Sequence, residues 1–271
     1  MSGADVLRVA AVQMTTGSDS TANVVVAARL VAEAANLGAR FIVLPEKWPL
    51  LQATESDPSQ SLEGEWISAA RGWAVKFGLA ILVGSALETV PAGQQAHNAS
   101  VLIAPNGRVL AVYRKLHLFD VDVAGMTYRE SATTLAGEDV VVADVLGSRI
   151  GMSVCYDLRF PELYRALVDR GAEVLAVPSA FTAVTGAAHW HVLLRARAIE
   201  NQCFVIAANQ VGRHANGTES YGHSIIIDPW GRILAEMESG EGVIVADLDF
   251  AELRQIRASL PALAHRRRDV I

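Results

Sequence analysis

The sequence predicts an α/β fold in which layers of β-sheet are covered by helices. Short apolar runs, as at residues 41–44, are typical of strands that are covered on both faces. Segments with apolar residues at helical spacing, as at 24–36, alternate with these runs. A Pro-Asn-Gly turn at 105–107 lies between two further apolar runs and indicates a hairpin.

Length and composition favour a single domain spanning residues 1–271. The 271 residues are enough for a large core, and no Ser/Gly/Pro-rich linker divides them. Hydrophobic residues make up 51% of the chain, yet no apolar run reaches the roughly 18 residues that span a bilayer. We therefore expect no membrane partner, and the surplus apolar residues should fill a thick core or a subunit interface.

Charge and cysteine content narrow the functional classes further. A formal net charge of −6 argues against a general nucleic-acid binder. The basic cluster at 266–268 belongs to a tail of about residues 260–271, which we expect to be solvated or to lie at a dimer interface. Two cysteines, Cys155 and Cys203, make a poor disulfide framework, and no signal-peptide pattern begins the chain. These features favour a cytoplasmic protein, with Cys203 in the core.

The first half of the chain predicts strands, two helices and a hairpin. A strand at 7–14 leads to the helix at 24–36, which Thr21 or Asn23 could cap and which Gly38 ends. The predicted elements that follow are a strand at 41–44, a helix at 65–77, a strand at 79–87, and hairpin strands at 98–104 and 108–113. Residues 121–137 are loop-like, and the segment is long enough to cover a site.

The second half of the chain also predicts strands that alternate with helices. Pro161 is suited to the first turn of a helix that Gly171 ends. A second helix is expected at about 188–201 and a short one at 252–259. The predicted strands lie at 140–145, 149–154, 173–177, 203–208, 224–227, 233–237 and 243–248.

Three reactive side chains each come directly after one of these predicted strands. Glu46, Lys115 and Cys155 each follow directly on an apolar strand. Ligands of open α/β sheets bind at the carboxyl ends of strands. If the three strands lie parallel in one sheet, the three side chains project from the same edge.

These residue types together suit acyl transfer through a thioester. A nearby Lys ammonium and a helix amino end favour the reactive thiolate of Cys155. The Glu46 carboxylate can accept the thiol proton, pass it to a leaving amine and later activate water. The Lys115 ammonium and the backbone N–H after Cys155 can stabilise an oxyanion. This chemistry needs no metal and no cofactor.

Each residue also has an ordinary structural interpretation. Cys155 could be a buried core cysteine, Glu46 a turn acid and Lys115 a solvated strand end. Their joint occurrence favours the catalytic interpretation. His117 is a weaker candidate as partner of the thiol, because Glu46 and Lys115 already supply a base and a cation.

Three motifs resemble the signatures of the nitrilase superfamily of carbon–nitrogen hydrolases, in the same order and with the same spacing. They are Phe-Ile-Val-Leu-Pro-Glu46, Tyr-Arg-Lys115-Leu-His-Leu-Phe-Asp and Val-Cys155-Tyr-Asp-Leu-Arg-Phe-Pro-Glu. The resemblance covers about the whole chain and implies a four-layer α-β-β-α sandwich. It implies Glu46 as general base, Lys115 as oxyanion stabiliser and Cys155 as nucleophile. It also implies that Glu130, otherwise an ordinary loop acid, positions the substrate or Lys115, and that the chain forms a homodimer.

Further runs resemble the amidase branch that contains ω-amidase and the amidase of deaminated glutathione. These runs lie at 178–190, 195–203 and 221–231, and the Pro after Arg-Phe in the third signature and Gly-Arg-His at 212–214 favour the latter enzyme. The implied reaction releases 2-oxoglutarate and cysteinylglycine from deaminated glutathione. Alternatives are 2-oxoglutaramate and another small amide or N-carbamoyl substrate. A catalytically retired interaction protein would lack one of the three reactive residues, and none is missing.

A substrate with a carboxylate next to a keto group would benefit from a guanidinium near the thiol. Arg159 is the candidate, although it could instead pair with Asp157 or Glu162. Four other residues are expected at the substrate site because of their positions near Cys155 or a strand end: Tyr156, Phe181, Thr182 and His189. His189 could equally be a packed residue at the start of a helix.

Overall fold

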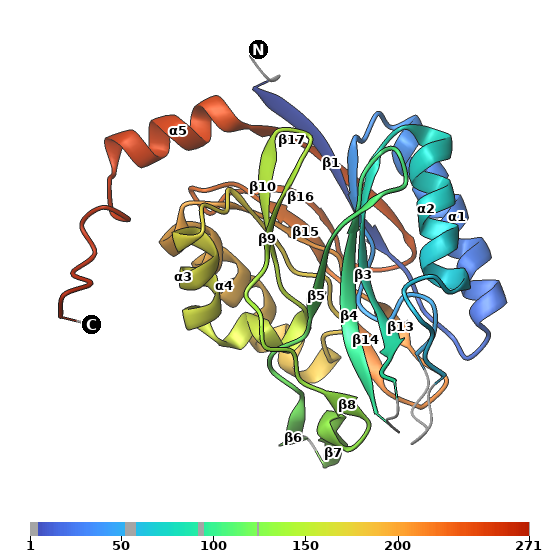
Figure 1. Cartoon of the computed structure of the whole chain (residues 1–271). Helices are drawn as coiled ribbons and strands as arrows, with labels where there is room; N and C mark the ends of the chain where they lie inside the picture. Colours follow the sequence, from blue (N-terminus) through green and yellow to red (C-terminus); the bar gives the residue numbers. More distant parts are fainter. Residues whose placement is uncertain (1–4, 52–57, 92–94, 124, 271) are drawn as a thin grey trace.

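Two β-sheets lie face to face in the middle of the molecule, and helices cover their outer faces (Figure 1). This is a computed structural model, and it describes residues 5–51, 58–91, 95–123 and 125–270. The arrangement confirms the predicted four-layer α-β-β-α sandwich.

The first sheet has the strand order β17-β1-β2-β3-β4-β5, with β8 paired to β4. Its strands are β1 (Val6–Gln13), β2 (Phe41–Val43), β3 (Ala80–Thr89), β4 (Ala96–Ile103), β5 (Val109–Arg114), β8 (Thr134–Leu135) and β17 (Gly242–Asp249). Strands β2 and β3 are parallel, while β4 is antiparallel to both β3 and β5. Strands β2 and β5 therefore point the same way and end at the same edge of the sheet.

The second sheet has the strand order β16-β15-β12-β11-β10-β9. Its strands are β9 (Val142–Val145), β10 (Ser148–Met152), β11 (Val174–Ala176), β12 (Phe204–Ala207), β15 (Ser224–Ile227) and β16 (Ile233–Met237). Strands β10, β11 and β12 are parallel, so the segments that follow them leave from one edge. The chain therefore places several loops at that edge of the second sheet.

Two helices cover each outer face. Helices α1 (Ser20–Asn36) and α2 (Glu65–Phe77) pack on the first sheet, and α3 (Pro161–Asp169) and α4 (Ala183–Asn201) on the second (Figure 1). Helix α5 (Phe250–Ser259) follows β17 and leads to the C-terminal end (Figure 1).

Alternating side chains of the first sheet fill two apolar layers. Val9 and Ala11 of β1 belong to the core shared with the second sheet, whereas Ala10 and Val12 belong to the core under α1 and α2. Because both faces of the strand are buried here, residues 9–12 are all apolar, and burying one such side chain contributes about 1.5–3 kcal/mol for a residue the size of Val. This explains why the predicted strands read as continuous apolar runs.

Two predicted helix starts differ from the structure. Helix α1 begins at Ser20 because the side chain of Asp19, not Thr21 or Asn23, accepts the first backbone N–H groups. Helix α4 begins at Ala183, five residues before the predicted start. Its first turns are rich in small residues and lack apolar periodicity, and one of these residues, Gly186, lies so close to Tyr221 that a Cβ would come within 2.3 Å of the ring.

The loop predicted at 121–137 is mostly ordered structure. It contains the hairpin strands β6 (Asp120–Val123) and β7 (Met126–Arg129), a 3₁₀ turn and β8. Asp122 accepts hydrogen bonds from Thr127, at 2.7 Å, and from Arg129, at 2.8 Å. These cross-strand polar contacts stabilise a hairpin whose strands have only four residues each and were not predicted.

Within the described residues, no helix is long and apolar enough to cross a membrane. Part of the basic tail packs against the chain itself, because Arg266 and Arg268 form ion pairs with Asp169 at the end of α3.

Candidate active site

The two sheets together, and not one sheet, bring the three reactive residues to one place. Glu46 follows β2 and Lys115 follows β5 at one edge of the first sheet, whereas Cys155 follows β10 of the second sheet. The expectation of a single sheet edge is therefore wrong. The site lies where the strand ends of the two packed sheets meet, because face-to-face packing aligns their edges.

Backbone contacts hold the segment around Glu46 on both sides. A Cβ on Gly84 would come within 1.9 Å of the Leu44 carbonyl oxygen, so only glycine allows this approach. Next to it, the Lys47 N–H donates to Ser85 Oγ at 3.0 Å. From the second sheet, Gln210 Nε2 donates to the Glu46 carbonyl oxygen at 3.0 Å. These contacts fix the direction in which the Glu46 side chain leaves the strand.

The Glu46 carboxylate is buried and fully engaged. Its Oε1 atom accepts hydrogen bonds from Asn98 Nδ2 at 2.9 Å and from Lys115 Nζ at 3.1 Å. Its Oε2 atom accepts the backbone N–H of Ala180 at 2.8 Å. A carboxylate held by three donors keeps one orientation, as a positioned base requires.

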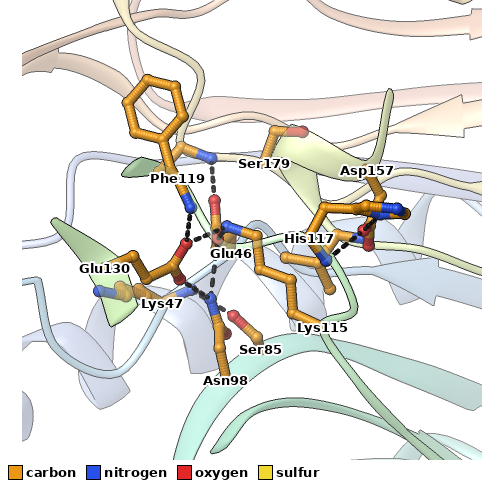
Figure 2. A network of polar contacts seen from close by, with 12 residues as sticks. Glu46, Lys47, Ser85, Asn98, Lys115, His117, Phe119, Glu130, Asp157 and Ser179 are labelled. Carbon is orange, nitrogen blue, oxygen red and sulfur yellow. Dashed lines mark hydrogen bonds and ion pairs between the residues drawn. The ribbon is translucent and has the colours of Figure 1, made fainter. Parts of the chain in front are cut away.

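Figure 2 shows the Lys115 ammonium between the carboxylates of Glu46 and Glu130. Its Nζ atom lies 2.8 Å from Glu130 Oε2, and the side chain is 2% exposed. Burial acts to lower the pKa of Lys115, but the Glu130 and Glu46 carboxylates outweigh it and raise the pKa well above its ordinary value. The ammonium is therefore a permanent positive charge inside the site.

Glu130 completes a buried network with Asn98 (Figure 2). The Asn98 amide donates to Glu130 Oε1 at 3.1 Å as well as to Glu46, and the Phe119 N–H donates to Glu130 Oε2 at 2.8 Å. Burial acts to raise the pKa of Glu130, but the ammonium groups of Lys115 and Lys47 outweigh it and hold the pKa at about 2. The Glu130 carboxylate thus remains ionised beside Lys115.

We expect Glu130 to make the fold acid-sensitive. Its pKa of about 2 in the folded chain lies below the ordinary value of 4.5, so its stabilising effect is complete above about pH 4.5 and is lost as the pH falls towards about 2. The free energy of unfolding should fall in this window by up to about 1.4 kcal/mol per pH unit from this group. Urea unfolding of wild type and of Glu130→Gln at several pH values measures the difference. A slope as steep in Glu130→Gln as in wild type would contradict the assignment.

Cys155 begins a sharp turn at the end of its strand segment. Its φ of 50° lies in the left-handed region, and its N–H donates to the Pro178 carbonyl oxygen at 2.9 Å. A 3₁₀ turn over Cys155–Arg159 follows, and the Tyr156 N–H is one of the first amides of that turn, which have no acceptor within it. This amide is available to a ligand at the thiol.

The resting thiol is protonated, contrary to the expectation of a stabilised anion. Burial raises the pKa of Cys155 well above its ordinary value, the Glu46 carboxylate raises it further, and Lys115 only partly offsets these effects. A hydrogen bond between Cys155 and Glu46 contributes to the same shift. The proton must therefore move to a base when the sulfur attacks, and Glu46 is in position to take it.

Buried Asp157 fixes the turn that carries the thiol. Its carboxylate accepts the Tyr113 hydroxyl at 2.6 Å and the Val154 N–H at 2.8 Å. It also contacts His117 Nδ1 at 2.7 Å, and the His117 ring stacks on Phe160. His117 thus pairs with Asp157 and not with Cys155, and the segments that carry Lys115 and Cys155 are tied together.

A cavity of about 440 Å³ opens over these groups. Glu46, Lys115, Cys155 and Glu130 line it, together with residues of the β6–β7 hairpin and of the hairpin formed by β13 (Val211–Arg213) and β14 (Glu219–Tyr221). The segment at 121–137, which was expected to cover the site as a loop, therefore does line the cavity, but it does so as a hairpin.

Four of the five predicted substrate residues line the cavity. They are Tyr156, Arg159, Phe181 and Thr182. The Arg159 guanidinium lies 5.2 Å from the centre of the Phe181 ring and 5.9 Å from that of Tyr156, and it does not pair with Asp157 or Glu162. His189 is not among the residues that line the cavity, and it contacts Arg159, whose Nη1 lies 3.2 Å from His189 Nδ1.

Asn98 is the polar residue of this network that the sequence analysis missed. It is fully buried in β4 and donates to both carboxylates. An amide side chain within a strand that ends in an apolar run was the available signal, because a buried amide requires hydrogen-bond partners. Its partners come from distant segments, so their identity did not follow from the sequence.

Comparisons with known proteins agree with this geometry. A family model described as carbon-nitrogen hydrolase matches residues 8–258. A deaminated glutathione amidase of Synechocystis sp. is 44% identical over 265 residues, which cover 95% of this chain and 97% of that protein.

Solved structures show the same fold. The NitFhit protein of C. elegans has a TM-score of 0.92 and 34% sequence identity, and the match covers 98% of this chain but 66% of that one. Saccharomyces cerevisiae Nit3, described as a member of branch 10 of the nitrilase superfamily, has a TM-score of 0.87 and 30% identity over 97% of both chains.

Proposed function

The chain belongs to the carbon–nitrogen hydrolase family and is a hydrolase of non-peptide carbon–nitrogen bonds, and we propose that it cleaves deaminated glutathione through a thioester on Cys155. The products are 2-oxoglutarate and cysteinylglycine. The observation that carries the proposal is a cavity holding thiol, carboxylate, ammonium and guanidinium groups together.

Each step uses a group of the site. Glu46 takes the thiol proton as the sulfur attacks the amide carbonyl carbon. The Lys115 ammonium and the Tyr156 N–H stabilise the oxyanion. Protonated Glu46 then gives its proton to the leaving amine, and the carbon–nitrogen bond breaks. Glu46 next removes a proton from water, which hydrolyses the thioester and regenerates the thiol.

Glu130 and Asn98 are proposed to position this machinery. Both contact Lys115 or Glu46 directly, and neither is required to exchange a proton. Their hydrogen bonds keep the ammonium and the carboxylate in place while charge develops at the carbonyl oxygen. A preorganised polar site of this kind stabilises a transition state without reorganising during the reaction.

The size and charge of the cavity support the larger of the two keto-acid amides. A volume of about 440 Å³ lies within the range of about 300–1,000 Å³ found for pockets of drug-sized ligands. Deaminated glutathione has about twice as many heavy atoms as 2-oxoglutaramate and carries two carboxylates. The cavity offers Arg159 and Lys47 to these groups, whereas Arg129, which also lines it, pairs with Asp122. The names of the curated relatives point to the same substrate.

We expect kcat/KM for deaminated glutathione to exceed that for 2-oxoglutaramate, and Arg159→Lys to reduce both. The planar guanidinium can bind a carboxylate through two hydrogen bonds, which Lys cannot, so the loss should be about tenfold or more. A neutral amide of similar length is the control and should lose little. Release of cysteinylglycine and of ammonia measures the two reactions. A preference for 2-oxoglutaramate would indicate an ω-amidase, and equal losses on the neutral amide would contradict the role of Arg159.

A cytoplasmic location is part of the proposal. Cys155 and Cys203 are both free thiols, and a reducing compartment preserves them. The homodimer expected from the family resemblance stays a prediction.

A further inference from the structure

A second cluster of reactive side chains lies outside the active site, between α4 and the edge of the second sheet. His191 belongs to α4, His223 immediately precedes β15, and Glu236 belongs to the edge strand β16. Their potential ligand atoms all lie within 4.8 Å of one another. The mechanism proposed above uses none of these three residues.

Two imidazoles converge on one carboxylate oxygen. His191 Nε2 and His223 Nδ1 both lie 2.7 Å from Glu236 Oε1. In the pairing of β15 with β16, Ile225 is opposite Glu236, and His223 precedes Ile225 by two residues. The sheet therefore places His223 and Glu236 as diagonal neighbours, and α4 brings His191 to the same point.

Neighbouring residues hold His223 in this orientation. The Tyr221 ring stacks on the His223 ring, with centroids 4.2 Å apart and planes 21° apart. Trp190 Nε1 donates to the His223 carbonyl oxygen at 2.8 Å. Outer contacts of this kind orient the ligands of metal sites.

We propose that His191, His223 and Glu236 form a binding site for a divalent transition-metal ion, and specifically for Zn²⁺. Two imidazole nitrogens and one carboxylate oxygen are a ligand set that zinc uses in proteins, with bonds of about 2.0–2.2 Å and a fourth position open to water. Tetrahedral ligand atoms at such bond lengths lie about 3.3 Å apart, so the two distances between imidazole nitrogen and carboxylate oxygen must lengthen by about half an ångström when the ion enters.

Charge and access also suit a cation. Both imidazoles face one oxygen of the Glu236 carboxylate, which is the acidic ligand of the set. The three side chains are 21–31% exposed, which leaves a path for the ion.

The ion would tie α4 to the edge of the second sheet. Helix α4 begins at the cavity wall, where Thr182 and Thr185 line the cavity, and His189 of the same helix contacts Arg159. An ion bound two residues beyond His189 would stabilise the position of this helix. The site is thus structural, and the reaction at Cys155 does not depend on its chemistry.

Zinc titration of chelator-treated protein without a polyhistidine tag tests the proposal. The Cys155→Ala variant is used throughout, because the active-site thiol could itself bind zinc. Calorimetry should show one Zn²⁺ per chain. Further substitution His191→Ala or Glu236→Gln should weaken binding at least about tenfold, whereas the exposed tail variant His265→Ala should bind as tightly as its parent.

Two other measurements use the same proteins. Zn²⁺ should raise the Tm of the parent by mass action and leave that of His191→Ala nearly unchanged. Co²⁺, as a spectroscopic substitute, should give the visible absorption of a four-coordinate site only when all three residues are present. No saturable binding by the parent, or equal affinity in His191→Ala, would overturn the proposal.

Discussion

Replacing Cys155 by Ala is expected to abolish hydrolysis, with a loss in kcat of at least about 10⁴-fold. The proposed reaction passes through a bond to the Cys155 sulfur, and the remaining groups can only polarise the amide. The fold should survive, because Cys155 lies at a strand end and Ala removes one atom. Product release under saturating substrate measures the loss, and circular dichroism checks the fold.

Cys203 provides a matched control for this experiment. It is also a free buried cysteine, and burial raises its pKa to about 12, but its Sγ contacts the Ala172 and Asn201 carbonyl oxygens, and Cys203 is not among the residues that line the cavity. Cys203→Ala should cost some stability and little activity. Cys155→Ser should be nearly inactive too, because a neutral hydroxyl is a far weaker nucleophile than sulfur. Appreciable turnover by Cys155→Ala would contradict the thioester mechanism.

Replacing Glu46 tests the role of the base beside the thiol. If Glu46 also activates the water that ends the reaction, Glu46→Gln should lose both steps, since an amide cannot accept a proton. The Cys155 pKa gives the reason: burial keeps the thiol protonated, so the reaction needs a proton acceptor at the moment of attack. The site therefore depends on a base beside the thiol and not on a resting thiolate.

The parts of the site that could be predicted are those that a short stretch of sequence identifies. Glu46, Lys115 and Cys155 each sit in a local motif at a strand end, so short stretches of sequence identify them. The layered fold also followed from local patterns, because strands covered on both faces are continuously apolar. These features depend on neighbours along the chain.

Features that depend on distant neighbours could not be predicted. The assignment of β10 to a second sheet requires knowing which strands pair, and no local pattern specifies this. The pKa of Cys155 was expected to fall because Lys115 and a helix end were considered, whereas burial and Glu46 dominate once the chain folds. The position of His189 depends on a similar distant feature, since the start of α4 places its ring beside Arg159 and not among the residues that line the cavity.

The second large effect is expected on replacing Lys115, whose ammonium lies between the Glu46 and Glu130 carboxylates. Lys115→Met should reduce kcat at least about 10³-fold, because the oxyanion loses a preorganised cation. It should also lower the free energy of unfolding by about 3–5 kcal/mol, since the Glu46 and Glu130 carboxylates would remain buried without their common counter-ion. Steady-state kinetics and urea unfolding measure the two effects separately.

The double variant Lys115→Met/Glu130→Gln separates catalysis from stability. Neutralising Glu130 removes one of the two uncompensated charges, so part of the lost stability should return while kcat remains low. Additive losses in stability would mean that Lys115 and Glu130 do not interact, against the 2.8 Å contact between them. Recovery of activity together with stability would show that Lys115 acts only by holding the fold. A stable but inactive double variant is the result expected if the ammonium stabilises the oxyanion itself.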